Sequence, residues 1–149
     1  MRRLVAILTL TLIAAGAIAV AEAATPVKTK LGTKHDDHMI GTNGADVMSG
    51  RDGDDRIVGR GGDDQLTGDS GRDTLIGGPG RDTLMGGSSA DTLEGGPGKD
   101  SFDGGSGSDR IKADDGVGGE SIVCGSGNDT VYADPGDKTH VGCEKVIRR

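Results

Sequence analysis

The chain has 149 residues and a formal net charge of −7, which argues against nucleic acid as a partner because phosphate backbones attract basic surfaces. An ordinary globular core is also excluded, since the chain has no Trp, one Phe and one Tyr against 29 Gly. Glycine loses the most conformational freedom when a chain becomes ordered. The composition therefore indicates either disorder or a fold stabilised by something other than apolar burial.

The first 23 residues have the features of a secretory signal peptide. Arg2 and Arg3 precede an apolar run over residues 4–20, and Ala21-Glu22-Ala23 has the small-x-small pattern of a cleavage site. We expect cleavage after Ala23, which leaves a secreted, extracellular chain of net charge −8 without a membrane segment, because two Arg and one Glu are removed. An uncleaved anchor is the alternative, since a run of 17 residues is just long enough to span a bilayer.

Residues 32–112 consist of nine consecutive units of nine residues each. Each unit begins with Gly, and its fourth place is Gly except at His35 and Ser89. The sixth place is always Asp: Asp37, Asp46, Asp55, Asp64, Asp73, Asp82, Asp91, Asp100 and Asp109. The eighth place is always apolar: Met39, Met48, Ile57, Leu66, Leu75, Leu84, Leu93, Phe102 and Ile111.

Each unit predicts one turn and one short strand. Glycines at places one and four permit turns with positive φ, and the three residues around place eight form a strand with one inward side chain. Two units make one coil, and successive coils stack at about 4.7–4.9 Å. Units of the same parity then lie above one another, so that place-eight residues form two facing inner columns. The first column is Met39, Ile57, Leu75, Leu93 and Ile111, and the second is Met48, Leu66, Leu84 and Phe102.

The same stacking brings the place-six aspartates into two rows, one along each edge of the stack. Carboxylates at this spacing repel one another unless a cation lies between them. Carboxylate and turn carbonyl oxygens suit calcium, a hard ion that accepts 6–8 oxygens, better than magnesium, which demands tighter geometry. The pattern therefore predicts calcium between neighbouring coils.

The units resemble the RTX, or hemolysin-type, calcium-binding nonapeptide G-G-x-G-x-D-x-U-x, closely over residues 32–112 and loosely over 113–137. The resemblance implies an all-β fold, a parallel β-roll or right-handed β-solenoid of about eleven units, two per coil. It also implies that the place-six aspartates and loop carbonyls hold several Ca²⁺ ions, about seven if every gap between neighbouring coils fills. Carried over by position, the ligands are the nine place-six aspartates, with Asp129 as a further candidate.

Several units depart from this pattern. Place two is Thr33, Thr42, Arg51, Arg60 and Asp69 before Gly-Gly begins at Gly77. We expect weaker or missing ions beside His35 and Ser89. After Lys112 an eleven-residue unit places Glu120 at the aspartate position, where a site is doubtful, and in a later unit Lys138 takes the metal position.

Cys124 and Cys143 are the only cysteines, and such a pair in an exported chain predicts a disulfide. The bond would close a 20-residue loop, worth about 3 kcal/mol in the chain-entropy model. We expect it to cap the end of the roll where the repeat decays. The predicted organisation is a signal peptide at 1–23, a short leader segment at 24–31, the repeat domain at 32–132 and the C-terminal cap at 133–149.

These features predict a non-catalytic calcium-binding module that folds when calcium binds. The repeats fill the mature chain, and neither H-E-x-x-H nor G-x-S-x-G occurs, so an enzyme is not expected. The alternative is a calcium-rigidified adhesion or cell-envelope protein. Ile40, Val58 and Ile76 share a parity and an outward place, and this exposed apolar column is a candidate surface for a homodimer or an envelope partner.

Overall fold

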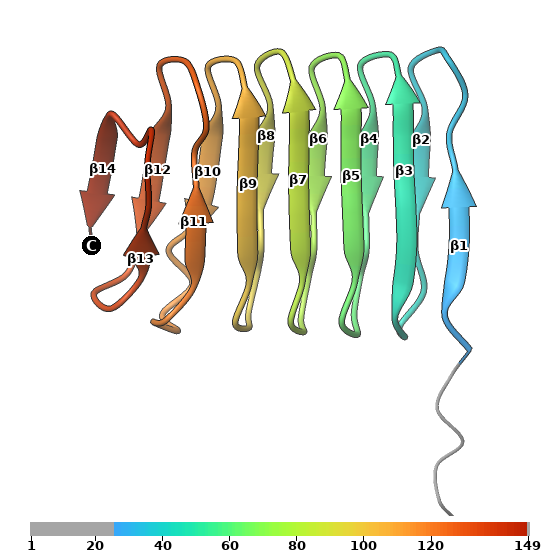
Figure 1. Ribbon diagram of the computed structural model, residues 1–149. Coiled ribbons are helices and arrows are strands. Elements are labelled where there is room, and N and C mark those ends of the chain that lie inside the picture. Colours follow the sequence, from blue (N-terminus) through green and yellow to red (C-terminus); the bar gives the residue numbers. More distant parts are fainter. Residues whose placement is uncertain (1–25, 149) are drawn as a thin grey trace, which may run out of the picture.

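Two parallel β-sheets face each other and form a flattened solenoid (Figure 1). The computed structural model describes residues 26–148, so the expected signal peptide at 1–23 lies outside the described part of the chain. Within residues 26–148 there are fourteen strands and no helix. The first sheet contains, in spatial order, β1 (Lys28–Leu31), β3 (Asp46–Asp52), β5 (Gln65–Ser70), β7 (Thr83–Ser88), β9 (Ser101–Ser106), β11 (Ser121–Val123) and β13 (Lys138–Thr139). The second contains β2 (His38–Ile40), β4 (Arg56–Val58), β6 (Thr74–Ile76), β8 (Thr92–Glu94), β10 (Arg110–Ala113), β12 (Thr130–Ala133) and β14 (Lys145–Arg148).

Successive strands alternate between the two sheets, so that one coil consists of two strands and two turns. Residues 18 apart are paired through the regular part, as in Ile57 with Leu75 on β4 and β6. This register confirms the predicted β-roll with two nonapeptide units per coil. The stack has about seven coils and is longer than the predicted eleven units, because β1 extends it at one end and β13 and β14 at the other.

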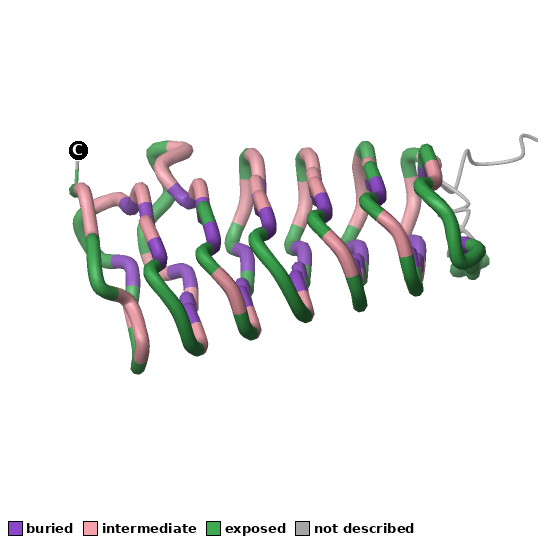
Figure 2. Tube along the Cα trace, turned by 90° about the horizontal axis from the view of Figure 1, so that it is seen from above, coloured by how far each residue is buried: buried purple, intermediate pink, exposed green. Residues whose placement is uncertain are grey.

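The core consists of two inner columns, one from each sheet, and both predicted columns are confirmed. In Figure 2 buried segments recur on both sides of successive coils. Val131 continues the first column and Ile122 the second, both fully buried. Each side chain contacts its equivalents in the coils above and below, so a unit with one apolar residue acquires a continuous core only by stacking.

The turns differ from expectation in which glycines carry the positive φ. In the units from Gly50 to Lys112, places two and four have positive φ, as in Gly78 at +107° and Gly80 at +149°, whereas the glycine at place one does not; in the first two units neither place does. Where place two is not glycine, Arg51, Arg60 and Asp69 adopt φ of +83°, +88° and +77°. Place one requires glycine for a different reason, which is lack of space beside its Cα.

The C-terminal cap is covalently closed. Cys124 and Cys143 form the predicted disulfide, with their Cα atoms 5.1 Å apart. β13 and β14 add one further strand to each sheet, and Val146 packs against the core. No helix long and apolar enough to cross a membrane occurs in the part of the chain that the structure describes.

Candidate metal centre

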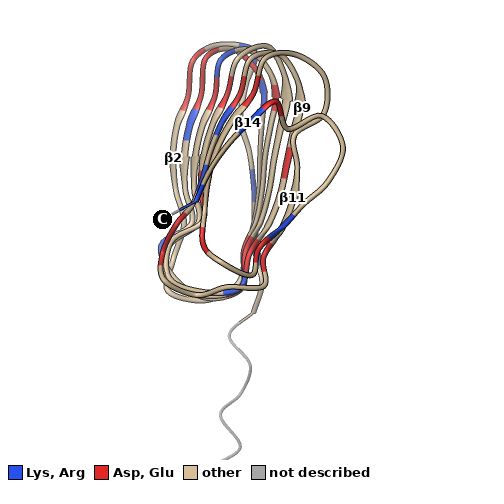
Figure 3. Ribbon diagram, turned by 90° about the vertical axis from the view of Figure 1, so that its left-hand side faces the viewer, with Lys and Arg blue, Asp and Glu red and all other residues tan. Residues whose placement is uncertain are grey.

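Acidic side chains gather in rows along the two edges where the sheets meet (Figure 3). Within each row, the carboxylate at place six accepts the backbone N–H of its equivalent in the preceding coil. The N–H of Asp73 donates to Oδ1 of Asp91 at 2.8 Å, and the same contact recurs along both edges at 2.7–2.8 Å. One oxygen of each aspartate is therefore satisfied by the chain itself, and the rows are hydrogen-bonded ladders.

The second carboxylate oxygen is left without a donor. Among the described residues, Oδ2 is buried and unpartnered at Asp55, Asp64, Asp73, Asp82, Asp91, Asp100, Asp109 and Asp129. A buried oxygen without a partner is costly, most of all when it is charged. Each of these atoms therefore requires a cation or a proton that the chain does not provide.

A place-one glycine lies beside most of these Oδ2 atoms. A Cβ added to Gly86 would lie 2.5 Å from Oδ2 of Asp91 and 2.6 Å from the carbonyl oxygen of Gly104. The equivalent pair of oxygens, one carboxylate and one carbonyl from the next coil, faces Gly50, Gly59, Gly68 and Gly77. The carboxylate oxygen and the carbonyl oxygen therefore lie on either side of a space beside the glycine Cα, and any side chain in place of the glycine would fill that space.

Burial raises the pKa of these carboxyl groups far above the ordinary value of 3.8. The pKa is about 7 for Asp82 and Asp91, where burial is the main cause, and carboxylates of neighbouring coils add to it. It is about 6 for Asp64, Asp73, Asp100 and Asp109, again mainly through burial. The ladder hydrogen bond opposes the shift without cancelling it.

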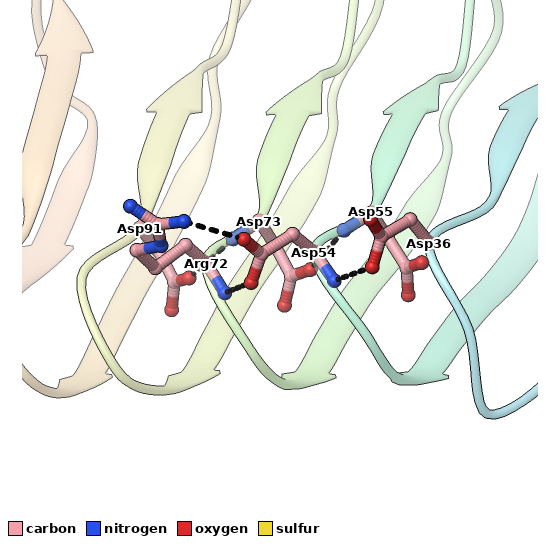
Figure 4. Close-up of polar contacts among 6 residues, drawn as sticks. All are labelled: Asp36, Asp54, Asp55, Arg72, Asp73 and Asp91. Atoms are coloured by element: carbon pink, nitrogen blue, oxygen red, sulfur yellow. Dashed lines mark hydrogen bonds and ion pairs between the residues drawn. The ribbon is translucent and has the colours of Figure 1, made fainter.

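A second ladder at place five runs beside the first on the outside of the turns (Figure 4). The N–H of Asp54 donates to Oδ1 of Asp36 at 2.9 Å, and the N–H of Arg72 donates to Oδ1 of Asp54 at 2.8 Å. Arg72 also pairs with Asp54 through Nη2 and Oδ2 at 2.7 Å. Asp36 and Asp54 are exposed, and Asp54 has a cationic partner, which distinguishes them from the buried place-six row.

In the two N-terminal turns, which we call the threonine-closed turns, a threonine at place two donates hydrogen bonds to the place-six aspartate. Oδ2 of Asp37 accepts both the N–H and the hydroxyl of Thr33, at 2.6 and 2.9 Å. Oδ2 of Asp46 accepts the same two groups of Thr42, at 2.5 and 3.0 Å, but its Oδ1 is buried without a donor. Threonine at place two therefore supplies the donors that are missing in the later turns, and the place-two pattern alone did not indicate this.

The place-six rows on both edges extend further toward the C-terminus than the repeat count predicted. The expectation that Lys138 takes the metal position is wrong: Lys138 pairs with Ser121, which places Asp137 beside Glu120. The turn before Asp137 is one residue shorter than in the repeats, because Pro135 and Gly136 directly precede the carboxylate. On the other edge Glu144 ends the ladder, since its Oε2 accepts the N–H of Asp129 at 2.9 Å.

The two irregular turns of the regular repeat differ from each other. Ser89 keeps the consensus backbone, with a φ of +86°, and its N–H bonds the carbonyl of Ser106 at 2.7 Å. His35 is exposed and donates its N–H to Thr33 Oγ1 at 3.2 Å, within the threonine-closed turn. Weaker ions beside these two turns stay a prediction.

The donor set fits calcium. Nowhere in residues 26–148 do three or more His, Cys, Asp or Glu side chains converge on one point, so any ion in the ladders must combine carboxylates with backbone carbonyls. Mixed carboxylate and carbonyl coordination is what calcium accepts, and zinc or copper sites would need nitrogen or sulfur.

The fold and these oxygen-lined turns define a calcium-binding β-solenoid. A family model for the RTX calcium-binding nonapeptide repeat matches the chain in four copies, over residues 31–66, 40–75, 76–111 and 114–137. The matched residues make up more than half of the chain, which therefore belongs to the RTX calcium-binding nonapeptide repeat family. Membership in this family indicates that the repeats bind calcium. No curated protein matches the sequence.

Proposed function

We propose that this chain is a secreted, non-catalytic module that folds when calcium binds along its two aspartate ladders. The observation that carries the proposal is the row of buried Oδ2 atoms without donors, most of which face a carbonyl oxygen beside a place-one glycine. The ligands would be the nine place-six aspartates of the regular units together with Asp129, and a bound Ca²⁺ would supply the positive charge that these oxygens lack.

Without calcium the fold is opposed by two large free-energy costs. Ladder carboxylates remain buried and charged beside one another, and glycines at two or three places of most units lose their backbone freedom. The free energy of calcium binding then becomes free energy of folding, as in other small metal-dependent domains. Extracellular calcium modules bind at about 10⁻⁴ to 10⁻³ M, so the chain would stay unfolded in the cytosol and fold after export.

The number of ions stays near the seven expected from the gaps between regular units. Seven divalent ions would overcompensate a mature net charge of −8, so the end positions should fill last. The threonine-closed turn at Asp37 supports this order, because its Oδ2 already has donors. Oδ2 of Asp46 has donors as well, although its Oδ1 is buried without one. The positions in the middle of the stack are then the first to fill.

The absence of a catalytic constellation in residues 26–148 supports a non-catalytic role. His35, His38 and His140 are all exposed. Oγ of Ser121 lies 3.3 Å from Nε2 of His140, but no carboxylate accepts from that imidazole among the described contacts. A serine nucleophile requires a base that is itself oriented by a third group.

Circular dichroism of the purified mature chain during a calcium titration tests the proposal, with magnesium and a chelator as controls. We expect β signal to appear with calcium alone, at millimolar or lower concentration. A chain that is fully ordered in excess chelator, with no ion retained, would contradict the proposal.

The second candidate function is a calcium-rigidified adhesion or envelope protein. Ile40, Val58 and Ile76 lie side by side on β2, β4 and β6, and the register confirms them as one outer column. Ile40 is 38% exposed, the other two are half-buried, and Glu94 and Lys112 end the column as an ion pair at 2.9 Å. Val58→Asp tests a dimer through this face by mass in solution: a lower mass than wild type would support it, and an unchanged monomer would exclude it.

A further inference from the structure

Glu120 is the most unusual buried group in the molecule. Its side chain is 1% exposed, and neither Oε1 nor Oε2 receives a hydrogen bond. The ladder aspartates each leave one oxygen without a donor, whereas Glu120 leaves two. The N–H of Asp100 forms no bond to Glu120 among the described contacts, because the longer side chain and the expanded unit break the ladder at this point.

Glu120 lies between acidic residues of the neighbouring coils, and two cationic side chains lie close to them: a Cβ added to Gly119 would be 3.1 Å from Lys99 Nζ, and Arg148 donates to the carbonyl oxygen of Asp137 at 3.4 Å. Asp100 lies beside it in the preceding coil and Asp137 in the following one, as the pairing of Ser121 with Ser101 and Lys138 shows. Both carboxylates are buried, and Oδ2 of Asp100 has no donor either. Among residues 26–148, no Lys or Arg forms an ion pair with Glu120, Asp100 or Asp137.

Asp137 is held in place facing Glu120. Its Oδ1 accepts the N–H of Gly119 at 2.9 Å and that of Glu120 at 3.2 Å, and its Oδ2 accepts the N–H of Asp134 at 2.7 Å. Three backbone donors thus fix this carboxylate before any ion is considered. The side chains of Glu120 and Asp137 are in direct contact, and two ionised acceptors in contact need a cation or a proton between them.

This position differs from the ladder sites in its construction. The unit that contains Glu120 begins with Ala113, which is buried, so the place-one glycine of the regular positions is missing. Asp115 lies nearby and is fixed by N–H groups of Val117 and Gly98, at 2.7 and 2.9 Å. The oxygen ligands for an ion at this position would therefore be side chains from an irregular loop and from the cap.

We propose that Glu120 and Asp137 hold one divalent cation of the calcium type, which joins the C-terminal cap to the expanded unit of residues 113–123. The inference rests on the proposed function for the choice of ion, but its residues lie outside the regular units. The cap is then attached at two points, by this ion on one edge of the roll and by the Cys124–Cys143 bond. Calcium would order residues 133–140 as well as the repeats.

The test is a count of bound Ca²⁺ per chain, by equilibrium dialysis with metal analysis, in wild type and in Glu120→Gln. The glutamine amide can donate to Asp137, so the variant should fold while needing no ion at this position. We expect one ion fewer than wild type. The matched control is Glu94→Gln, a half-buried position on β8 that pairs with Lys112 away from the cluster, which should bind as many ions as wild type.

The outcomes separate this inference from the proposed function. If wild type binds no calcium, both fail; if wild type binds calcium and Glu120→Gln binds the same number, this inference alone is overturned. Should Glu120→Gln not fold in calcium, Asp137→Asn provides the same count, and an unreduced number there also overturns the inference. A loss of one ion, with residues 133–140 exchanging amide hydrogens faster in Asp137→Asn, would support it.

Discussion

Asp73 and Asp91 lie one coil apart, and the backbone N–H of Asp73 donates to Oδ1 of Asp91 at 2.8 Å while Oδ2 of Asp91 has no donor. Because one oxygen of Asp91 is hydrogen-bonded and the other is left for an ion, we can predict how Asp91→Asn changes the calcium requirement for folding. The amide keeps an oxygen for the ladder bond and removes the buried charge. Because outer-shell changes alone cost about 10–100-fold in metal affinity, loss of a direct ligand should raise the calcium concentration at half-folding at least as much.

A calcium titration followed by circular dichroism measures this effect. Asp52→Asn is the control, since Asp52 is an exposed residue of β3 outside both ladders. If the two variants fold at the same calcium concentration, Asp91 is not a ligand.

The place-one glycines predict a steric effect of Gly86→Ala. The new Cβ would lie 2.5 Å from Oδ2 of Asp91 and 2.6 Å from the carbonyl oxygen of Gly104, so the turn or the carboxylate must move. Overpacking of this kind costs about 1–3 kcal/mol. Thermal unfolding in saturating calcium should show the loss. Gly61→Ala is the control, because its nearest neighbour would be 3.6 Å away, and equal stability of the two variants would contradict the steric account.

The threonine-closed turns predict that Thr42→Gly gains an ion. Removing the hydroxyl leaves Oδ2 of Asp46 with one donor fewer and gives place two its consensus residue. We expect about one additional Ca²⁺ per chain by metal analysis, and a loss of about 1 kcal/mol from the missing hydrogen bond when calcium is limiting. Thr42→Ser retains the hydroxyl and should bind as many ions as wild type. An unchanged count in Thr42→Gly would show that threonine does not replace calcium there.

The raised pKa values predict how pH affects the calcium-free chain. The pKa of Asp82 and Asp91 in the fold is about 7, mainly through burial, against 3.8 as the ordinary value. The folded form therefore holds protons that the unfolded form has released. This stabilisation is fully present below about pH 4 and is lost as the pH rises through about 7. In metal-free buffer, β signal should be greater at pH 4.5 than at pH 8.

Calcium should reverse the direction of this pH dependence. Protons and Ca²⁺ compete for the same carboxylates, so the calcium concentration at half-folding should rise as the pH falls from 7 to about 5. Paired titrations at the two pH values check the prediction. A calcium requirement that is lower at the acidic pH would contradict it.

The strict period of nine made most of the fold predictable from the sequence. A period repeated without a gap assigns every side chain to an inner, outer or turn position, and both core columns and both aspartate rows followed from that assignment. The positive φ at place two did not follow, because non-glycine residues, Arg51, Arg60 and Asp69, stand there in three of the units that have it. Which place bends is decided by hydrogen bonding between coils, and the residue types alone do not show it.

The C-terminal end of the ladders could not be predicted for a different reason. Counting in nines assigns Lys138 to the metal place, but a turn through Pro135 and Gly136 is one residue shorter and brings Asp137 there instead. A Pro-Gly pair also precedes the aspartate in the units of Pro79 and Pro97, there with one residue between the pair and the aspartate, so the aspartate that follows Pro-Gly was the available signal. The burial of Glu120 depends on the fold of the expanded unit, which the period does not describe.

The one-coil spacing of the strand pairs has a mechanical consequence. Each coil is bonded only to the coils before and after it, and paired residues are 18 apart in the regular part. A pull on the two ends of the chain would therefore peel off coils one at a time, and each released coil would add about 60 Å of length. The Cys124–Cys143 link would hold the final segment shut against the same tension, so the extension is shorter than the contour of the whole chain.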